Sequence, residues 1–402
     1  MATITQTHGG VTTAKGFAAS GVAAGIKKSG NEDLAVVRSE KPCTAAGAFT
    51  QNAVRAACVD RNRALLPSND IYAIVVNAGN ANACTGTQGK QDVETTALRT
   101  AEALSIRPKQ VLVASTGVIG EFLPMDRVTQ GIKSCAPQLS VEGGTRFAEA
   151  IMTTDTVVKE YALSVGFTKG TILIGGCAKG SGMIHPNMAT MLAFITTDAA
   201  IAPQALDKAI KRVVDKTFNN LTIDGDTSTN DMVVILANGM SGVPVTSASE
   251  LAAFENALYE ICNNQCSQIA ADGEGATKRV DITVTGGETS EDNRRAAKSI
   301  AGSNLVKTAM FGGDPNWGRI LCAVGYSGAR FSEENIEVRL CGLSVCRALR
   351  PVAFPADEMH SKLSQNIVSI EVDLGLGGND VSVAHTCDLT YDYVKINAEY
   401  HT

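Results

Sequence analysis

The chain has 402 residues, which is enough for two or more domains with sizeable cores. Hydrophobic residues make up 44% of it and charged residues 19%, a composition typical of globular proteins. The formal net charge of −6 argues against a nucleic-acid-binding protein, because such proteins normally present a basic face.

The N-terminal segment, residues 1–17, has neither the apolar core of a secretory signal nor the arginine-rich pattern of a transit peptide. No apolar run in the sequence has the length of a membrane span. We therefore expect a cytoplasmic protein without membrane contact. An organelle stroma or matrix is the alternative if a transit peptide has been removed.

The apolar runs alternate with amphipathic segments, which predicts an α/β or α+β fold. The expected strands cover residues 71–78, 111–115, 161–167, 171–176, 191–197, 232–238 and 280–286. Apolar residues at helical spacing predict helices over 203–218, behind a proline, and over 249–262. From about residue 280 the pattern changes, and we expect a smaller C-terminal domain over 280–402. The last ten residues, 393–402, resemble a strand that ties the C-terminus into the structure.

The eleven cysteines are odd in number and scattered along the chain, as is typical of reduced, buried thiols. Two pairs are close in sequence, Cys262/Cys266 and Cys341/Cys346, but neither has a nearby histidine or second pair that would complete a zinc site. We therefore expect packing thiols and no metal site.

Common catalytic motifs find little support. The five histidines show no metalloprotease spacing, and a Ser–His–Asp triad would have to be assembled from distant residues. The glycine-rich segment "GGCAKGSG" (175–182) matches neither the P-loop nor the dinucleotide-binding fingerprint. Nucleotide binding is therefore not expected.

Several polar clusters fall in turn contexts, two of them directly after predicted strands. They cover residues 77–89, 114–120, 222–231, 272–278 and 312–320. Each cluster alone is consistent with ordinary turns and helix caps. Their number in one chain favours a functional site, because loops on a rigid scaffold carry function.

Thr190 lies where the irregular segment 179–189 meets the predicted strand 191–197. A threonine hydroxyl is a poor nucleophile unless a base lies beside it, and the α-amine of the same residue can serve. That amine exists only if the Ala189–Thr190 bond is cleaved. It would titrate near about 7.7–8.0, close to working pH. The residues alone leave a second interpretation open, in which Thr190 simply begins a strand.

At these positions the sequence resembles the ornithine acetyltransferase family, the bifunctional glutamate N-acetyltransferases of arginine biosynthesis. The resemblance runs from Gly10 to the C-terminus and is carried by "STGVIG", "AIMTTDT", "AKGSGMIHPNMATML", "DGDTSTND", "DGEGATK" and "DPNWGRI". It implies a layered α-β-β-α core, shared with the N-terminal-nucleophile aminopeptidases, and a smaller C-terminal α/β domain.

The resemblance also implies a self-cleaving precursor. Cleavage between Ala189 and Thr190 would give an α chain, 1–189, and a β chain, 190–402, associated as an (αβ)₂ heterotetramer. Thr190 would take the acetyl group of N-acetylornithine and pass it to glutamate in a ping-pong reaction that needs no external cofactor. Some members also use acetyl-CoA as the donor, and the motifs do not separate the two types.

The residues implied by the resemblance can be mapped one by one. Thr116 and Gly117 would form the oxyanion hole that stabilises the tetrahedral intermediate. Substrate-binding positions fall on Thr153, Lys179, Thr190, Glu274, Asn397 and Thr402. Lys179 can meet a substrate carboxylate and Glu274 a substrate amine. The clusters 224–231 and 314–320 receive no catalytic role and are expected to be structural.

Two alternatives of different classes remain. An N-terminal-nucleophile amidase or aminopeptidase would pass the acyl group to water instead of glutamate. A non-catalytic binding protein that kept the fold would remain uncut and would not depend on Thr190.

Overall fold

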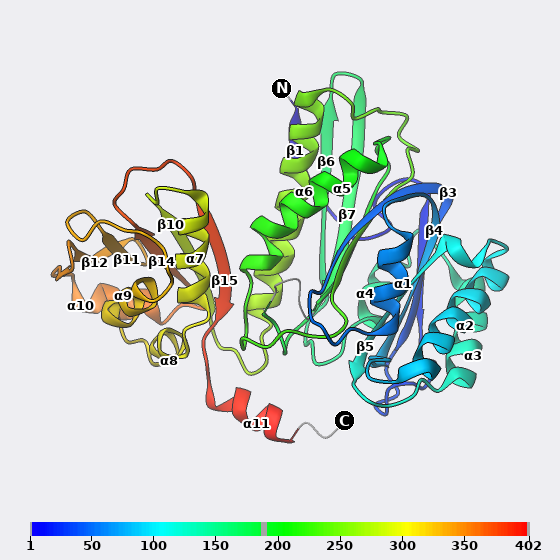
Figure 1. The fold of residues 1–402 in the computed structure, drawn as a ribbon, viewed down its shortest axis with the longest axis horizontal. Helices are drawn as coiled ribbons and strands as arrows, with labels where there is room; N and C mark the ends of the chain where they lie inside the picture. The colour runs from blue at the N-terminus through cyan, green and yellow to red at the C-terminus, as the bar shows by residue number, and fades with distance from the viewer. Residues whose placement is uncertain (1, 186–190, 400–402) are drawn as a thin grey trace. The chain divides into compact units, whose positions relative to one another are not determined.

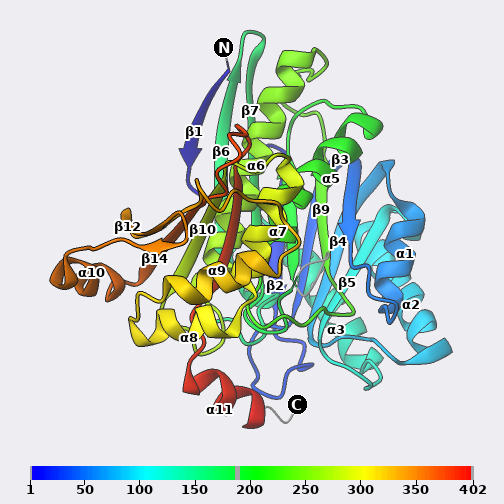
Figure 2. The ribbon, with the colours of Figure 1, turned by 60° about the vertical axis from the view of Figure 1, so that its left-hand side comes forward.

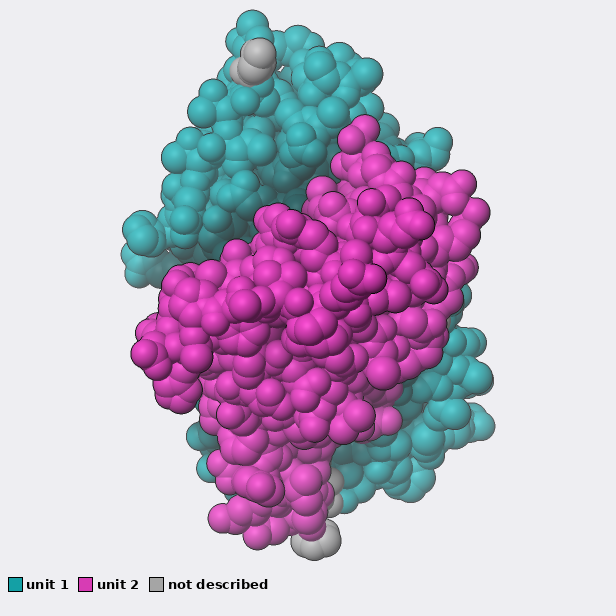
Figure 3. Space-filling model, turned by 90° about the vertical axis from the view of Figure 1, so that its left-hand side faces the viewer, with its two compact units in different colours: residues 1–180, 187–215, 227–265 teal, residues 181–186, 216–226, 266–402 magenta. Residues whose placement is uncertain are grey.

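The structure is a computed structural model and describes residues 2–185 and 191–399. The chain divides into two compact units, coloured separately in Figure 3. Unit 1 comprises residues 1–180, 187–215 and 227–265, and unit 2 comprises 181–186, 216–226 and 266–402. Unit 2 therefore takes two short segments from the middle of the chain in addition to its C-terminal part. The predicted mixed α/β class is confirmed.

Unit 1 is built on a sheet that has nine strands in the described part of the chain, in the order β1-β6-β7-β8-β9-β3-β4-β5, with β2 paired to β3. The strands are β1 (Thr3–Thr7), β2 (Phe17–Val22), β3 (Leu34–Phe49), β4 (Ser68–Asn80), β5 (Val111–Val118), β6 (Lys159–Phe167), β7 (Gly170–Lys179), β8 (Leu192–Thr197) and β9 (Met232–Ala237). The pairs β4–β5 and β8–β9 are parallel, and the other pairs are antiparallel.

The central position of β8 and β9 in the sheet explains why their sequences are continuous apolar runs. Every residue of both strands is buried, whereas a strand with one solvated face would alternate. The predicted strands over 191–197 and 232–238 are confirmed to within one residue at each end.

Helices cover the sheet of unit 1 (Figure 1). They are α1 (Ala57–Leu65), α2 (Gly86–Leu104), α3 (Met125–Cys135), α4 (Gly144–Ala150), α5 (Pro203–Lys216) and α6 (Ala248–Ala271), with short 3₁₀ turns η1 (Pro108–Gln110) and η2 (Ala136–Gln138). The first two pack against β5, and α3 and α4 against β2 and β3. The hydroxyl of Tyr161 on β6 hydrogen-bonds Glu260 on α6 at 3.0 Å, which places α6 beside β6. This helix runs nine residues beyond the predicted end at residue 262.

Unit 2 has its own sheet, six-stranded within the described residues, in the order β13-β12-β11-β14-β10-β15. Figure 2 labels its strands β10, β12 and β14. Its strands are β10 (Arg279–Thr285), β11 (Glu337–Leu340), β12 (Leu343–Arg347), β13 (Arg350–Pro351), β14 (Ile367–Asp373) and β15 (Ser382–Cys387). Its helices are η3 (Phe218–Asn220), α7 (Ser290–Ala301), α8 (Asn304–Gly312), α9 (Trp317–Gly325), α10 (Ala356–Leu363) and α11 (Tyr391–Glu399).

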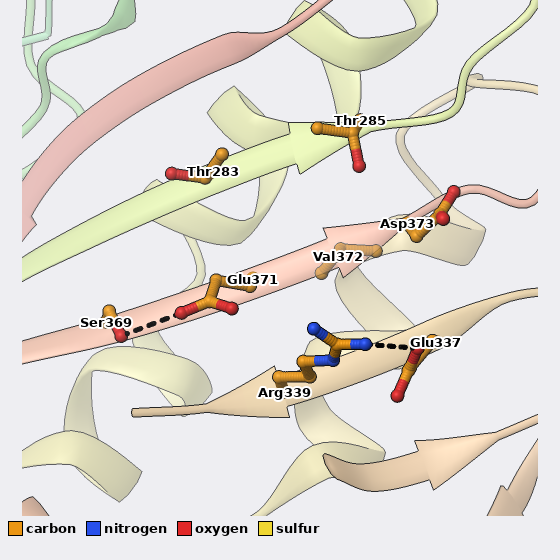
Figure 4. Close-up of a pocket in the computed structure, with 8 residues that line it drawn as sticks. All are labelled: Thr283, Thr285, Glu337, Arg339, Ser369, Glu371, Val372 and Asp373. Carbon is orange, nitrogen blue, oxygen red and sulfur yellow. Dashed lines mark hydrogen bonds and ion pairs between the residues drawn. The ribbon is translucent and has the colours of Figure 1, made fainter. Parts of the chain in front are cut away.

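Strict alternation in β10 and β14 gives this second sheet one apolar and one polar face. Val280, Ile282 and Val284 are fully buried, and α7 packs against β10 and β15. The intervening residues of the neighbouring strands line a shallow polar hollow. Figure 4 shows its lining: Thr283, Thr285, Glu337, Arg339, Ser369, Glu371, Val372 and Asp373.

The prediction of a C-terminal strand over 393–402 is wrong for its described part, because Tyr391–Glu399 form the helix α11. The amide of Tyr393 donates to the Thr390 hydroxyl at 3.3 Å, an N-cap contact that starts a helix. Residues 400–402 lie outside the described part.

None of the described helices is long and apolar enough to cross a membrane.

The prediction of packing thiols agrees with the structure. Eight of the eleven cysteines are buried, and all eleven are free thiols. Among the described residues, no group of three or more His, Cys, Asp and Glu side chains is arranged to hold a metal ion.

Candidate active site

The predicted oxyanion-hole residues Thr116 and Gly117 lie near the end of β5, in unit 1. Gly117 pairs in register with Gly79 of β4 and has φ of +130°. A Cβ at this position would lie 2.3 Å from the carbonyl carbon of Gly79, so only glycine fits. The close approach of the two strands fixes the backbone amide of Gly117 at the sheet edge.

Asn230, just before β9, holds this strand end from a distant part of the chain. Its side-chain amide donates to the carbonyl of Ser115 at 2.8 Å and to that of Ala81 at 2.6 Å. The Ser115 hydroxyl in turn donates to Asn77 at 2.7 Å. The buried polar network thus links three of the sequence clusters, 77–89, 114–120 and 222–231, around one strand end.

The predicted substrate residues Lys179 and Thr153 are in direct contact, also in unit 1. The ammonium group of Lys179, at the end of β7, donates to the Thr153 hydroxyl at 2.6 Å. Asp155 lies 3.8 Å from the same ammonium group and forms a fully buried ion pair with Lys159 at 2.7 Å. It also accepts from the backbone amides of Thr153 at 3.0 Å and Gly180 at 2.6 Å.

Asp155 stays ionised in spite of its burial. Desolvation alone would raise the pKa of its carboxyl group, but the nearby charges of Lys179 and Lys159 lower that pKa below its ordinary value. A second acid close to Lys179 behaves differently, because burial raises the pKa of Asp231 well above its usual range. The Lys179 ammonium group is therefore buried beside an ionised carboxylate and near an acid whose pKa is raised.

The predicted residues Glu274 and Asn397 form a second contact, within unit 2. The Asn397 side-chain amide on α11 donates to the Glu274 carboxylate at 2.9 Å. The Glu274 amide donates to the Ser181 carbonyl at 3.0 Å, and the Ser181 hydroxyl donates to the Asp272 carbonyl at 2.6 Å. The carboxylate of Glu274 is thus fixed on a loop after α6, where it can receive an amine.

Segment 181–185, which leads towards the proposed cleavage site, is bound to the cluster 222–224 of unit 2. The Asp224 carboxylate accepts from the amides of Met183 at 2.6 Å and Ile184 at 2.8 Å. The His185 ring also hydrogen-bonds the Thr222 hydroxyl at 2.9 Å. The Asp224 contacts give the "DGDTSTND" motif a structural role at its first residue, and the Asn230 bonds described above do so near its end.

The structure therefore brings the predicted residues together as two pairs, one in each unit. Ala189, Thr190 and Thr402 lie outside the described residues. Sequence reasoning did not identify Asp155, Lys159 or Asn230. The only signal for Asp155 was its place in the "AIMTTDT" motif, since its partners Lys179 and Gly180 are distant in sequence.

Comparisons with known proteins agree over nearly the whole chain. A family model described as "ArgJ family" matches residues 18–402. The protein named "Arginine biosynthesis bifunctional protein ArgJ" from Symbiobacterium thermophilum is 50% identical over 398 residues, which cover 98% of this chain and 99% of that protein. The protein of the same name from Synechococcus sp. is 48% identical over 409 residues, covering 99% of this chain and 98% of the relative.

Solved structures are also similar, and one of them aligns with a TM-score above 0.5. The crystal structure of the arginine biosynthesis bifunctional protein from Bacillus halodurans is 44% identical, with a TM-score of 0.51. The match covers 100% of the solved chain but 52% of this chain.

Proposed function

The chain belongs to the ArgJ family, and on that premise we propose that it is a bifunctional acetyltransferase of arginine biosynthesis that transfers the acetyl group of N²-acetylornithine to glutamate. The observation that carries this proposal is the similarity to bifunctional proteins of arginine biosynthesis. About half of the residues are identical, over nearly the whole length of both chains. The contact of Lys179 with Thr153 supports it, because two residues mapped to substrate binding are neighbours and one of them is a cation that can pair with an amino-acid carboxylate.

Self-cleavage between Ala189 and Thr190 would create the nucleophile. The B. halodurans chain supports this step, since its full length corresponds to 52% of this chain. Residues 190–402 are likewise about half of the chain, whereas the curated relatives are matched over nearly their whole length. A polypeptide cut near its middle would yield chains of that size.

The first half-reaction forms an acetyl-enzyme. The Thr190 hydroxyl attacks the acetyl carbonyl of N-acetylornithine while its own α-amine takes the proton. The Thr116 hydroxyl and the Gly117 amide donate to the oxyanion of the tetrahedral intermediate. The intermediate collapses as the amide C–N bond breaks, and ornithine leaves with the proton.

The second half-reaction returns the enzyme to its starting state. The amine of glutamate attacks the acetyl-Thr190 ester, and the same two donors hold the second oxyanion. Breakage of the ester C–O bond releases N-acetylglutamate and restores the hydroxyl, so the sequence is ping-pong and needs no external cofactor. Lys179 would hold the substrate carboxylate and Glu274 a substrate amine, with Thr153, Asn397 and Thr402 completing the binding positions.

Acetyl-CoA is a second donor candidate for the same acetyl-enzyme. The two chains from one precursor would associate as an (αβ)₂ assembly in the cytoplasm. Hydrolysis is the competing fate of the acetyl group. A bound glutamate amine favours transfer, because a positioned nucleophile reacts with a high effective concentration.

The test combines a denaturing gel with an acceptor-dependence assay. Purified enzyme should show two fragments of about half length, with Thr190 at the N-terminus of one. Ornithine release beyond the first turnover should depend on glutamate, and acetyl-CoA should be tried in parallel. Thr190→Ala should remain uncut and inactive. Active protein that runs as a single full-length band would refute the proposal, and ornithine release that ignores glutamate would identify a hydrolase.

A further inference from the structure

The loop between β2 and β3 is rigidly built around Asp33. The buried Asp33 carboxylate accepts from the backbone amides of Ala24 at 2.7 Å, Ile26 at 2.5 Å and Lys27 at 2.9 Å. Three charge-assisted hydrogen bonds to one carboxylate fix the path of the loop. The backbone of Lys27 is therefore held in one position.

The stem of Lys27 lies against the strand that pairs with the oxyanion hole. A Cβ at Gly79 would lie 3.0 Å from Cγ of Lys27 and 3.3 Å from its backbone nitrogen. Gly79 is the register partner of Gly117. Lys27 is thus a neighbour of the backbone that would stabilise the oxyanion.

The ammonium group of Lys27 points towards the segment that holds Lys179. It donates to the carbonyl of Glu32 at 2.5 Å and to that of Ala150 at 3.5 Å. Ala150 begins the "AIMTTDT" motif, whose Thr153 binds the ammonium group of Lys179. Two lysine ammonium groups therefore contact the same short segment, which also carries Asp155.

Lys27 has no carboxylate within salt-bridge distance among the described residues, since Asp33 is engaged by backbone amides and Glu32 pairs with Arg146. Burial lowers the pKa of Lys27 and the charge of Lys179 lowers it further, whereas the charges of Asp33, Asp155 and Glu32 raise it. A half-buried ammonium group next to another cation is stabilised when an anion binds between or beside them.

We propose that Lys27 is a second carboxylate-binding residue of the transfer site and that it binds the side-chain carboxylate of the glutamate acceptor. This inference rests on the proposed function. N-acetylornithine has a single carboxylate, for which Lys179 suffices, whereas glutamate and N-acetylglutamate have two. Two cations beside the same segment would therefore favour a dicarboxylate in the second half-reaction.

The test uses Lys27→Met and, as a matched control, Lys28→Met, which removes the same charge from the exposed neighbouring residue. Each half-reaction is measured separately: ornithine release from N-acetylornithine, and exchange of labelled glutamate with N-acetylglutamate. In Lys27→Met, kcat/KM for glutamate should fall about tenfold to a hundredfold, the loss expected for one charged hydrogen bond. Ornithine release should change far less, and Lys28→Met should resemble the wild type in both reactions.

Glutamine as the acceptor separates charge recognition from a structural effect. Because glutamine lacks the second carboxylate, the preference for glutamate over glutamine should shrink in Lys27→Met and recover in Lys27→Arg. If the methionine variant does not fold, Lys27→Gln replaces it, since its amide can keep the bonds to the Glu32 and Ala150 carbonyls.

The outcomes distinguish this inference from the function on which it rests. A wild-type enzyme that transfers no acetyl group to glutamate defeats the proposed function itself. An active wild type with an unchanged glutamate-to-glutamine preference in the Lys27 variant overturns the role of Lys27 alone. Equal losses in both half-reactions also overturn it, because they indicate a structural contribution.

Discussion

At the scale of single residues, the buried lysines Lys159 and Lys179 depend on the charge of Asp155. This carboxylate is fully buried, pairs with Lys159, and accepts from two backbone amides. Its neighbours lower its pKa although burial opposes them. Asp155 therefore contributes to stability only while it is ionised.

We predict that Asp155→Asn destabilises the protein by roughly 3–5 kcal/mol at pH 7, because Lys159 and Lys179 lose their buried counter-charge. The pKa of Asp155 is lower in the folded chain, so its stabilisation is complete above the unfolded pKa of about 3.9 and is lost as the pH falls through the folded pKa. Urea unfolding at pH 7 and in acid measures the difference in unfolding free energy between the wild type and Asp155→Asn. This difference should be smaller in acid.

The control is Asp60→Asn, which breaks the exposed ion pair of Asp60 with Arg55. Such pairs contribute at most about 1 kcal/mol. The charge assigned to Asp155 would be contradicted if Asp155→Asn lost no more unfolding free energy than Asp60→Asn does. It would also be contradicted if the loss did not change with pH.

At this scale, the sequence could indicate residue types but not their long-range partners. The family motifs placed Lys179 and Thr153 among the substrate residues, and the two side chains are in contact. The contacts of Asp155 with the Lys179 ammonium group and the Gly180 amide could not be predicted, because they join residues that lie far apart in the sequence. Glu274 and Asn397 were also mapped individually, but their hydrogen bond requires the helix α11.

At the scale of elements, the segment before β9 connects strands that are remote in sequence. Asn230 donates to the carbonyls of Ala81 and Ser115, and both bonds are buried. The segment thus ties the start of a central strand to the end of β5, next to Thr116. Its effect on the site would be exerted through position and not through contact with substrate.

We predict that Asn230→Ala leaves two buried carbonyl groups without their donor and costs about 2–4 kcal/mol of unfolding free energy. The end of β5 should shift, so kcat should fall while KM for N-acetylornithine changes little. Urea unfolding and steady-state kinetics measure the two effects. Asn52→Ala, which removes one partly buried bond to the Thr227 carbonyl and one exposed bond from the Val54 amide, is the matched control. Equal behaviour of the two variants would argue against a special role for Asn230.

Elements with an unambiguous hydrophobic pattern were predictable, and those decided by local capping were not. The uniformly apolar runs of β8 and β9 can only be buried, so their sequences predict central strands. The alternating Val394 and Ile396 also indicated a strand, but the Thr390 cap starts a helix there and none of its described side chains is buried. An apolar alternation without a neighbouring strand does not determine the structure.

At the scale of the whole molecule, the order of the nine strands in the described part of the larger sheet determines what the proposed cleavage can do. Strands β8 and β9 follow Thr190, yet they lie between β7 and β3, which precede it. Six residue pairs join β7 to β8, and six more join β3 to β9. The sequence could predict the strands but not this order, since no local pattern shows that a later strand inserts between two earlier ones.

We predict that the cleaved chains remain together in native buffer and separate only in denaturant. Separation would break the hydrogen bonds of two strand pairs and expose the buried apolar residues of β8 and β9. Native mass spectrometry should give 41.9 kDa per αβ pair, or a multiple of it, before and after complete cleavage. Uncut Thr190→Ala should have the same assembly mass. Dissociation of the two fragments on dilution would contradict this sheet order.

The interleaved sheet also has a consequence for how the molecule can be made. An α chain synthesised alone would contain a gap two strands wide, with an open edge on each side and no means of closing it. A β chain alone would carry two apolar strands with nothing to flank them. The two halves should therefore be insoluble when expressed from separate genes and recoverable only when translated as one polypeptide. The peptide bond that joins the two chains would then be needed while the sheet folds, and it would not be needed once the strands have paired.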